Sequence, residues 1–393
     1  MTTGTFKGAT LDSRQVKPGM LFVAVKGERV DGHDFIPQAL AAGAAGIIDG
    51  REELARTAAA YRRTLKAKVI GITGSAGKTT TKELVAAFLR AGGFRVHATE
   101  GNFNNDLGLP LTILNCPEDA EFLVVEMGTN HPGEIAYLVD IARPDAGVIS
   151  SVGTAHIEFF KTQDGIADEK GTLFARLPPD GFAVVGVNND RYERLRAMSA
   201  ARVVAVDPSD EVGARLASAL APRLPGAHNV SNARLAVACA GEFGVPPDRC
   251  VAALEDFALP GDRWRVTERD GVTYVNDCYN ANPTSMIAAL ETFAAMPCAG
   301  RRVAVLGDMF ELGAQSGELH ARVLARAAEL PLDAVFVVGA AMDGAAMAAA
   351  SARRPYQVAD AAAAKAALAA FVRAGDSVLL KASHGMHLEA VLA

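Results

Sequence analysis

Cysteines are few in this sequence, and their spacing argues against two kinds of site. The five are Cys116, Cys239, Cys250, Cys278 and Cys298. They are scattered and odd in number, and no two of them form a CxxC pair. The chain therefore shows neither the ligand spacing of a zinc site nor the paired framework of a disulfide-rich domain.

Long apolar runs and a surplus of positive charge are also missing. No uncharged apolar stretch reaches the roughly 18 residues that a membrane span needs. The first residues, MTTGTFKGATLDSR, contain no apolar signal core. The formal charge of −6 argues against a non-specific nucleic-acid binder, although local cations can still hold an anionic ligand. We expect a cytoplasmic protein that binds neither nucleic acid nor membrane.

The 393 residues, half of them hydrophobic, are enough for two or three domains. Residues 1–67 have the pattern of a small α/β unit. Short apolar runs predict strands at 21–25 and 46–48, and helical patterns cover 36–45 and 51–66. We place the first domain boundary after this unit.

Apolar strand patterns alternate with helical stretches through the rest of the chain, which predicts parallel α/β sheets. A central domain is expected at 68–258 and a third domain at 259–393. Strands are expected at 68–72, 122–125, 146–149, 182–185, 272–275, 302–306, 334–338 and 377–380, with helices at 79–91 and 359–372.

The stretch GITGSAGKTTTKEL, residues 71–84, has the features of a phosphate-binding loop. It follows a predicted strand and opens a predicted helix, whose free N–H groups and positive dipole end attract phosphate. Its glycines do not fit the common G-x-x-x-x-G-K-[ST] spacing, because Ile72 stands where the first glycine belongs. The alternative is a tight turn without a ligand, but Lys-Thr-Thr at a helix start has no packing rationale. The predicted nucleoside triphosphate contacts are Gly74, Ser75, Ala76, Gly77, Lys78, Thr79 and Thr80.

Other polar groups follow predicted strands, at the edge where open α/β sheets bind ligands. Glu126 ends one strand and is a candidate Mg²⁺ ligand, or else a surface acid. His156 follows another strand and could bind a metal, although a single histidine is more often a structural hydrogen-bonding group. Asparagine-rich loops at 100–105 and 279–283, and the loop at 381–386, are candidate ligand loops or simple turns.

Taken together, these motifs resemble the Mur ligase family over nearly the whole chain. Residues 12–14, 17–24 and 27–35 are similar to the family's uridine-binding domain, and residues 71–80 to its ATP loop, which departs from the common glycine spacing in the same way. The motifs at 101–110, 126–135, 279–286 and 306–313 are similar to the branch that adds D-alanyl-D-alanine to UDP-N-acetylmuramoyl-tripeptide (UDP-MurNAc-tripeptide).

The resemblance implies three domains: a uridine-nucleotide domain, a central ATPase domain with a phosphate loop on a parallel sheet, and a C-terminal Rossmann-like domain. It also implies ATP and Mg²⁺ as cofactors, UDP-MurNAc-tripeptide and D-alanyl-D-alanine as substrates, and a monomeric enzyme. The reaction would be an ADP-forming amide ligation through an acyl phosphate.

The resemblance also gives residues their roles. Lys78, His156 and Lys170 would be catalytic, and Thr79, Glu126, His156 and Lys170 would hold metal, with Lys170 matching a lysine that relatives carbamylate. Asn280, Asn282 and Arg263 would contact nucleotide. Substrate contacts would be Ser13, Arg14, Asn102, Asn104, Asn105, Asp308, Lys381, Ser383 and His384.

One motif departs from the family pattern. Where relatives commonly read Lys-Gly-Ser-Arg, this chain reads Lys381-Ala382-Ser383-His384, so a titratable imidazole replaces a fixed guanidinium. Alternatives that share the ATP loop are another Mur ligase or a folylpolyglutamate synthase-like enzyme, which a panel of amine substrates would separate. A non-catalytic nucleotide-binding module would bind nucleotide without amine-dependent release of phosphate.

Overall fold

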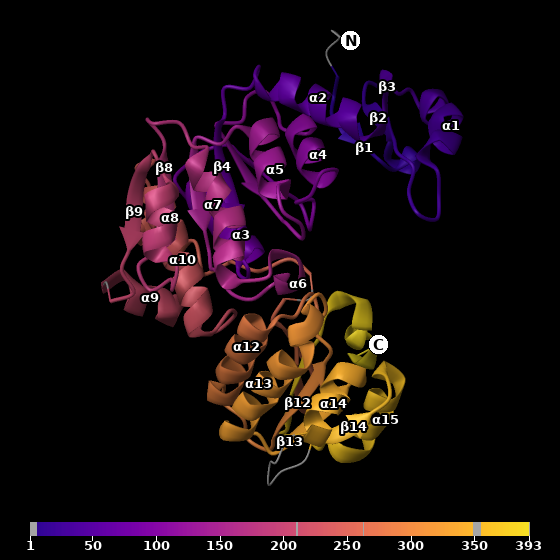
Figure 1. The fold of residues 1–393 in the computed structure, drawn as a ribbon, viewed down its shortest axis with the longest axis vertical. Coiled ribbons are helices and arrows are strands. Elements are labelled where there is room, and N and C mark those ends of the chain that lie inside the picture. Colours follow the sequence, from indigo (N-terminus) through magenta and orange to yellow (C-terminus); the bar gives the residue numbers. More distant parts are fainter. Residues whose placement is uncertain (1–5, 210, 262, 349–354, 393) are drawn as a thin grey trace.

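A computed structural model describes residues 6–209, 211–261, 263–348 and 355–392. Its strands form three separate sheets, one after another along the chain. The first and third sheets lie toward opposite ends of the molecule, with the central sheet between them along the chain (Figure 1). The α/β architecture expected from the sequence is confirmed. In the described part of the chain, no helix is long and apolar enough to cross a membrane.

The first sheet has three parallel strands in the order β1-β2-β3. They are β1 (Ala9–Thr10), β2 (Leu21–Ala24) and β3 (Gly46–Asp49), accompanied by η1 (Ser13–Gln15), η2 (Gly32–Phe35), α1 (Ile36–Ala41) and α2 (Gly50–Arg62). All four residues of β2 are buried, as its apolar sequence predicts. Helix α1 is shorter than expected, because Gly43 turns the chain with a φ of +92° soon after Ala41.

The central sheet has six parallel strands in the order β5-β6-β4-β7-β8-β9. They are β4 (Lys68–Thr73), β5 (Val96–Ala98), β6 (Phe122–Glu126), β7 (Ala146–Ile149), β8 (Phe182–Gly186) and β9 (Arg202–Val206). Every residue of β6 and β7 is buried, because helices cover both faces of the sheet. The strand order places the end of β4 beside the ends of β6 and β7.

Nine helices of the described segments accompany this sheet. They are α3 (Lys78–Ala91), α4 (Gly108–Leu114), α5 (Glu134–Ala142), α6 (Ile157–Phe160), α7 (Gln163–Ala175), α8 (Tyr192–Met198), α9 (Glu211–Leu220), α10 (Ala227–Gly241) and α11 (Pro247–Ala252). Helices α3 and α10 pack against each other, and α2 packs against α4 and α5. Helix α2 therefore belongs to the packing of both the first and the central sheet.

The third sheet is mixed, in the order β10-β11-β15-β12-β13-β14. Its strands are β10 (Arg265–Arg269), β11 (Val272–Asn276), β12 (Arg302–Gly307), β13 (Ala334–Val338), β14 (Tyr356–Val358) and β15 (Ser377–Lys381). The edge strand β10 pairs antiparallel with β11, and the other pairs are parallel. The sequence analysis did not predict β10, because its five residues are all exposed and lack an apolar pattern.

The helices of this third part are α12 (Pro283–Ala295), α13 (Ser316–Glu329), α14 (Ala340–Ala348) and α15 (Ala361–Phe371), with the short helices η3 (Gly313–Gln315), η4 (His384–Met386) and η5 (Leu388–Leu392). Helix α12 contacts α10, and η3 contacts α6. Figure 1 shows α6 at the junction between the central and third parts of the molecule. The ends of β4, β6 and β7 and the start of α12 thus come together at this junction.

Candidate active site

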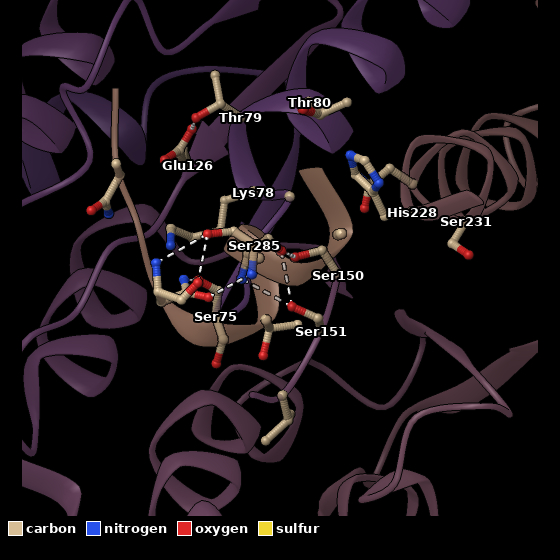
Figure 2. A pocket seen from close by; sticks show the side chains of 18 of the residues that line it. Ser75, Lys78, Thr79, Thr80, Glu126, Ser150, Ser151, His228, Ser231 and Ser285 are labelled. Carbon is tan, nitrogen blue, oxygen red and sulfur yellow. Dashed lines mark hydrogen bonds between the residues drawn. The ribbon is translucent and has the colours of Figure 1, made fainter. Parts of the chain in front are cut away.

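A cavity of about 710 Å³ lies where the central sheet meets the third sheet. Its walls come from the loop after β4, the loop after β5, the ends of β6 and β7, the start of α10 and the start of α12. Figure 2 labels side chains from the phosphate loop, α3, β6, the loop after β7, α10 and α12. The predicted edge of the central sheet therefore is the place where polar groups gather.

The loop between β4 and α3 has the backbone shape that its glycines permit. Gly74 has a φ of +154° and Gly77 a φ of +80°, both in the region that side chains disfavour. A Cβ at Gly74 would lie 2.0 Å from Ser150 Oγ, and one at Gly77 would lie 2.5 Å from Asn232 Oδ1. Gly77 is the N-cap residue of α3. It has no side chain that could cap the first N–H groups of the helix, so these groups are left for a phosphate.

The loop after β7 is hydrogen-bonded to the phosphate loop. The Ala76 N–H donates to Ser151 Oγ at 2.9 Å, and the Ser75 N–H donates to the Ser151 carbonyl at 2.9 Å. Ser150 Oγ donates to the Ala76 carbonyl at 2.6 Å. Figure 2 shows both serines close to the loop. These bonds hold the loop in one shape, which is the preorganisation that a phosphate site needs.

Lys78 lies at the first position of α3 and lines the cavity. Its ammonium donates to the Gly74 carbonyl at 2.8 Å, across the loop. Burial lowers the pKa of Lys78, the Glu126 carboxylate opposes this shift, and the Arg263 guanidinium adds to it. The Lys78 side chain thus crosses the phosphate loop at the wall of the cavity.

Glu126 ends β6 and is 1% exposed. Its Oε2 accepts from the Thr79 hydroxyl at 2.7 Å, and its Oε1 accepts from Asn104 Nδ2 at 2.7 Å. Figure 2 shows Thr79 and Glu126 facing each other. The Glu126 N–H in turn donates to Thr99 Oγ1 at 3.0 Å, which fixes the strand end.

These groups fit a magnesium ion. Mg²⁺ prefers oxygen ligands, takes one or two from carboxylates, and completes its shell with phosphate oxygens and water. The buried carboxylate of Glu126 beside the Thr79 hydroxyl supplies such a donor set. Ser75 Oγ, which also lines the cavity, is buried without a hydrogen-bond partner. Among the described residues, no group of three or more His, Cys, Asp or Glu side chains is placed so that it could hold a metal ion.

His156 and Lys170 lie in different surroundings. His156 lines the cavity at the start of α6, and its Nδ1 is bonded to the Glu311 carboxylate. Lys170, within α7, is 1% exposed and does not line the cavity. Its side chain makes no hydrogen bond or ion pair with any residue that the structure describes. Burial, with a smaller contribution from the Lys78 ammonium, lowers the pKa of Lys170 to about 7.

The third part of the chain closes the cavity with α12 and the loop before it. Asn282 caps α12 and donates from Nδ2 to the Ser75 carbonyl at 3.3 Å. Lys381, which is 3% exposed, donates to Asp277 Oδ2 at 2.6 Å and to the Asn280 carbonyl at 3.0 Å. Arg263 stacks on the Tyr279 ring, 3.4 Å from its centre. Asn280, Asn282, Arg263 and Lys381 all line the cavity.

The predicted substrate residues are distributed over three places. Asn102, Asn104 and Asn105 line the cavity. The Ser13 hydroxyl donates to Gln38 in the first domain, and the exposed Arg14 pairs with Asp12. Neither lines the cavity, and both belong to η1 beside the first sheet.

The remaining three lie in the third part of the chain, outside the cavity lining. Asp308 accepts from the N–H groups of Ala341 and Met342 at the start of α14. Ser383 is buried and accepts from the Phe310 N–H, whereas His384 is exposed beside Tyr279. In this conformation Asp308 and Ser383 hold loops of the third part together.

The sequence analysis missed a polar segment at the start of α10. His228, Asn229, Ser231 and Asn232 all line the cavity, and Asn232 lies next to Gly77 of the phosphate loop. Burial lowers the pKa of His228 to about 4, with the Asp277 carboxylate opposing the shift. The signal was present, since four polar residues in HNVSN open a helix that is otherwise rich in alanine.

Comparisons with known proteins identify the family of the chain. Three family models match successive parts of the chain: "Mur ligase family, catalytic domain" at residues 5–96, "Mur ligase middle domain" at 72–240, and "Mur ligase, glutamate ligase domain" at 262–384. The UDP-N-acetylmuramoyl-tripeptide--D-alanyl-D-alanine ligase of Escherichia coli (strain K12) is 36% identical over 373 residues, which cover 85% of this chain and 82% of the relative.

Solved structures give the same result. MurF from Acinetobacter baumannii matches with a TM-score of 0.87 at 30% identity, covering 100% of this chain and 94% of its own. MurF ligase from Thermotoga maritima in complex with ADP matches with a TM-score of 0.83 at 29% identity, covering 98% and 96%. With matches over nearly its full length, the chain belongs to the Mur ligase family.

Proposed function

We propose that this chain joins D-alanyl-D-alanine to UDP-MurNAc-tripeptide in an ATP-dependent, ADP-forming reaction of peptidoglycan precursor synthesis. The observation that carries the proposal is the shared cavity, in which a phosphate loop, the Thr79–Glu126 pair and residues of the third part face one another. The names of the relatives that match along the chain supply the substrates.

The proposed reaction has two steps. The terminal carboxylate of the tripeptide attacks the γ-phosphorus of ATP, ADP leaves, and an acyl phosphate forms. The amine of D-alanyl-D-alanine then attacks the acyl carbon, and the tetrahedral intermediate collapses to an amide with loss of phosphate and a proton. No covalent bond to the protein is needed, so the chain's work is positioning and electrostatics.

The phosphate loop supplies most of that work. The N–H groups at the start of α3 bind phosphate oxygens, and the Lys78 ammonium neutralises charge at the γ-phosphate. Two anions, a carboxylate and a triphosphate, must meet in this reaction, so a cation between them lowers the barrier. Arg263 and Asn282 approach the nucleotide from the third part of the chain.

Thr79, Glu126 and His156 would hold Mg²⁺, and Lys170 would join them after carbamylation. When bound, the metal would screen the phosphate charges as the γ-phosphoryl group is transferred. Lys170 is suited to carbamylation because it is buried, its side chain is unpaired among the described residues, and its pKa of about 7 leaves much of it neutral near pH 7. Its neutral amine would add to CO₂ with loss of a proton, which turns a buried cation into a carboxylate-like oxygen donor.

The substrate residues lie on separate parts of the chain. Ser13 and Arg14 would contact the uridine nucleotide on the first domain, and Asn102, Asn104 and Asn105 the peptide part in the cavity. Asp308, Lys381, Ser383 and His384 would bind the dipeptide. Because these groups are spread over three domains, at 1–67, 68–258 and 259–393, domain closure would assemble the site and protect the acyl phosphate from water.

The proposed enzyme acts as a monomer in the cytoplasm. ATP and the nucleotide-linked precursor are soluble anions of the cell interior, and none of the proposed steps requires a membrane.

The deciding experiment measures phosphate release from ATP and Mg²⁺ with UDP-MurNAc-tripeptide, with and without D-alanyl-D-alanine. Release should require both substrates. Tripeptides with diaminopimelate and with lysine at the third position are tested in turn, and at least one of them should support release. The Lys78→Ala variant should lose about 10²–10³-fold in rate, as when other preorganised charge-stabilising donors are removed. The exposed Lys66 provides the control, since Lys66→Ala should retain full activity.

Other results would change the conclusion in defined ways. Phosphate release with another amino acid or with a folate, but not with D-alanyl-D-alanine, would leave only the fold and the ATP chemistry. Binding of nucleotide without amine-dependent release would indicate a non-catalytic module.

A further inference from the structure

A hydrogen bond between a carboxylate and a histidine joins the candidate metal site to the third part of the chain. The Glu311 carboxylate of the loop before η3 bonds His156 Nδ1 at the start of α6. His156 has a side chain only 15% exposed, and Glu311 one 38% exposed. This pair lies at the junction of the two parts, where η3 contacts α6.

Both partners are fixed by their own surroundings. His156 has a φ of +59° and Glu311 a φ of +61°, a left-handed conformation that few residues other than glycine adopt. Such a conformation persists only where neighbouring structure holds it. Helices η3 and α6 also approach closely beside this pair, since a Cβ on Gly313 of η3 would lie 3.0 Å from Glu158 Cβ of α6.

The loop that carries Glu311 is anchored within the third part. The Met309 N–H donates to His320 Nε2 at 2.9 Å, and the Phe310 N–H donates to Ser383 Oγ at 3.0 Å. His320 is fully buried and its Nδ1 lies 2.7 Å from the Ser316 carbonyl. Because its loop is bound to α13 and to the loop after β15, Glu311 should move together with the third part of the chain.

The bond leaves one ring nitrogen of His156 for a ligand. With Nδ1 held by Glu311, Nε2 has no bond to any residue that the structure describes, and His156 lines the cavity. Histidines that bind metals almost always give their other nitrogen to a carboxylate or carbonyl, which fixes the ring and its tautomer. Glu311 stands in this relation to His156, but from another domain.

We propose that Glu311 is a positioning residue: it orients His156 Nε2 toward the metal and so makes metal binding depend on docking of the third part against α6. The inference rests on the proposed function, because it needs the metal site described above. The added point is that His156 is oriented to bind the metal only when the third part, which would bind D-alanyl-D-alanine, is docked against α6.

The test measures the affinity of the full-length enzyme for Mn²⁺, used in place of Mg²⁺, in the presence of ADP by electron paramagnetic resonance. Loss of an outer carboxylate typically weakens metal binding about 10- to 100-fold, so Glu311→Ala should fall in that range. Glu311→Gln keeps a neutral acceptor and should lose less. Affinity for ADP without metal should stay unchanged in both variants.

Two further variants separate orientation from a general loss of charge or of structure. Glu318, seven residues further on, is exposed, and Glu318→Gln should bind Mn²⁺ as the wild type does. In a His156→Gln background, Glu311→Ala should cause no further loss, since Glu311 acts through that ring.

Wild-type affinity in Glu311→Ala, or additive losses in the double variant, would overturn the inference and leave the ligase intact. Failure of the wild type to bind Mn²⁺ with ADP would overturn both the metal site and the inference. The phosphate-release assay would still decide the ligase reaction independently.

Discussion

Asn282 Nδ2 donates a hydrogen bond to the Ser75 carbonyl at 3.3 Å, although 207 residues separate them. The same side chain caps α12, because its Oδ1 accepts from the Ser285 N–H at 2.9 Å, and the Asn282 N–H in turn donates to Ser285 Oγ at 3.0 Å. One asparagine thus starts a helix of the third part and contacts the phosphate loop of the central part.

These two roles can be separated by substitution. Serine is a good N-cap but is too short to reach Ser75, so Asn282→Ser should keep stability and raise the KM for ATP. Asn282→Ala should raise KM similarly and also lower the free energy of unfolding by about 1 kcal/mol. Urea denaturation and ATP kinetics check both expectations.

Asp360 is the matched control for the cap alone. Its side chain accepts from the Ala363 N–H at 2.8 Å at the start of α15, and it does not line the cavity. Asp360→Ala should therefore lower stability by about 1 kcal/mol without changing the KM for ATP. An unchanged KM in Asn282→Ser would show that the bond to Ser75 does not matter for nucleotide binding.

Gly77 is required both for its backbone angle and for its lack of a side chain. A Cβ would meet Asn232 Oδ1 at 2.5 Å, so Gly77→Ala should displace the first N–H groups of α3. Loss of one hydrogen bond to a charged group costs about 1.5 kcal/mol, which corresponds to about tenfold weaker binding of ADP. Calorimetric titration with ADP measures this effect.

Gly93 isolates the contribution of backbone strain. It has a φ of +94°, similar to that of Gly77, but a Cβ there would meet nothing within 4 Å. Gly93→Ala should lower the free energy of unfolding by about 1 kcal/mol and leave ADP affinity unchanged. Equal ADP affinities for the two variants would contradict a role for the Gly77–Asn232 approach.

Lys170 should make the enzyme depend on dissolved CO₂. It is buried without a partner among the described residues, which disfavours its charged form and leaves the amine able to react. Enzyme freed of CO₂ should show a lower kcat that bicarbonate restores, and ¹³C-labelled bicarbonate should give a carbamate signal. Lys170→Met should lose both the activity and the signal, whereas Lys66→Met should lose neither. If added bicarbonate does not change the kcat of the CO₂-free enzyme, Lys170 is not carbamylated in the active enzyme.

Much of the central domain could be predicted because its signals are local. A run of apolar residues followed by glycines, Lys78 and Thr79 specifies a strand, a loop and a helix start within a dozen positions. The strand expected at 68–72 and the helix expected at 79–91 are confirmed, each with one more residue, as β4 (Lys68–Thr73) and α3 (Lys78–Ala91). Glu126 was predictable for a similar reason, since it ends a buried strand whose neighbours are fixed by the parallel order.

The contacts between domains could not be predicted in this way. The bonds Asn282–Ser75 and His156–Glu311 join residues that no periodic pattern relates, and one chain offers no covariation to reveal them. The edge strand β10 was missed because its side chains are all exposed, so pairing with β11 rather than burial makes it a strand. The polar start of α10 was visible but was not recognised.

His228 should make the stability of the protein fall in mild acid. Burial lowers its pKa to about 4 from the ordinary 6.5, with the Lys381 ammonium adding to the effect and the Asp277 carboxylate opposing it. Between these two values the unfolded chain binds more protons than the folded one, so the free energy of unfolding rises with pH across that window. Below about pH 4 both states are protonated, and the contribution of this group stops changing.

The change is measured by urea denaturation at several pH values between 7 and 4. A pKa difference of this size corresponds to about 3 kcal/mol lost over that range. His228→Gln should remove this part of the pH dependence, whereas His387→Gln, which replaces an imidazole that is 72% exposed, should retain it. If wild type and His228→Gln lose stability in parallel, His228 is not buried in its neutral form, and the wall of the cavity at α10 must open to water.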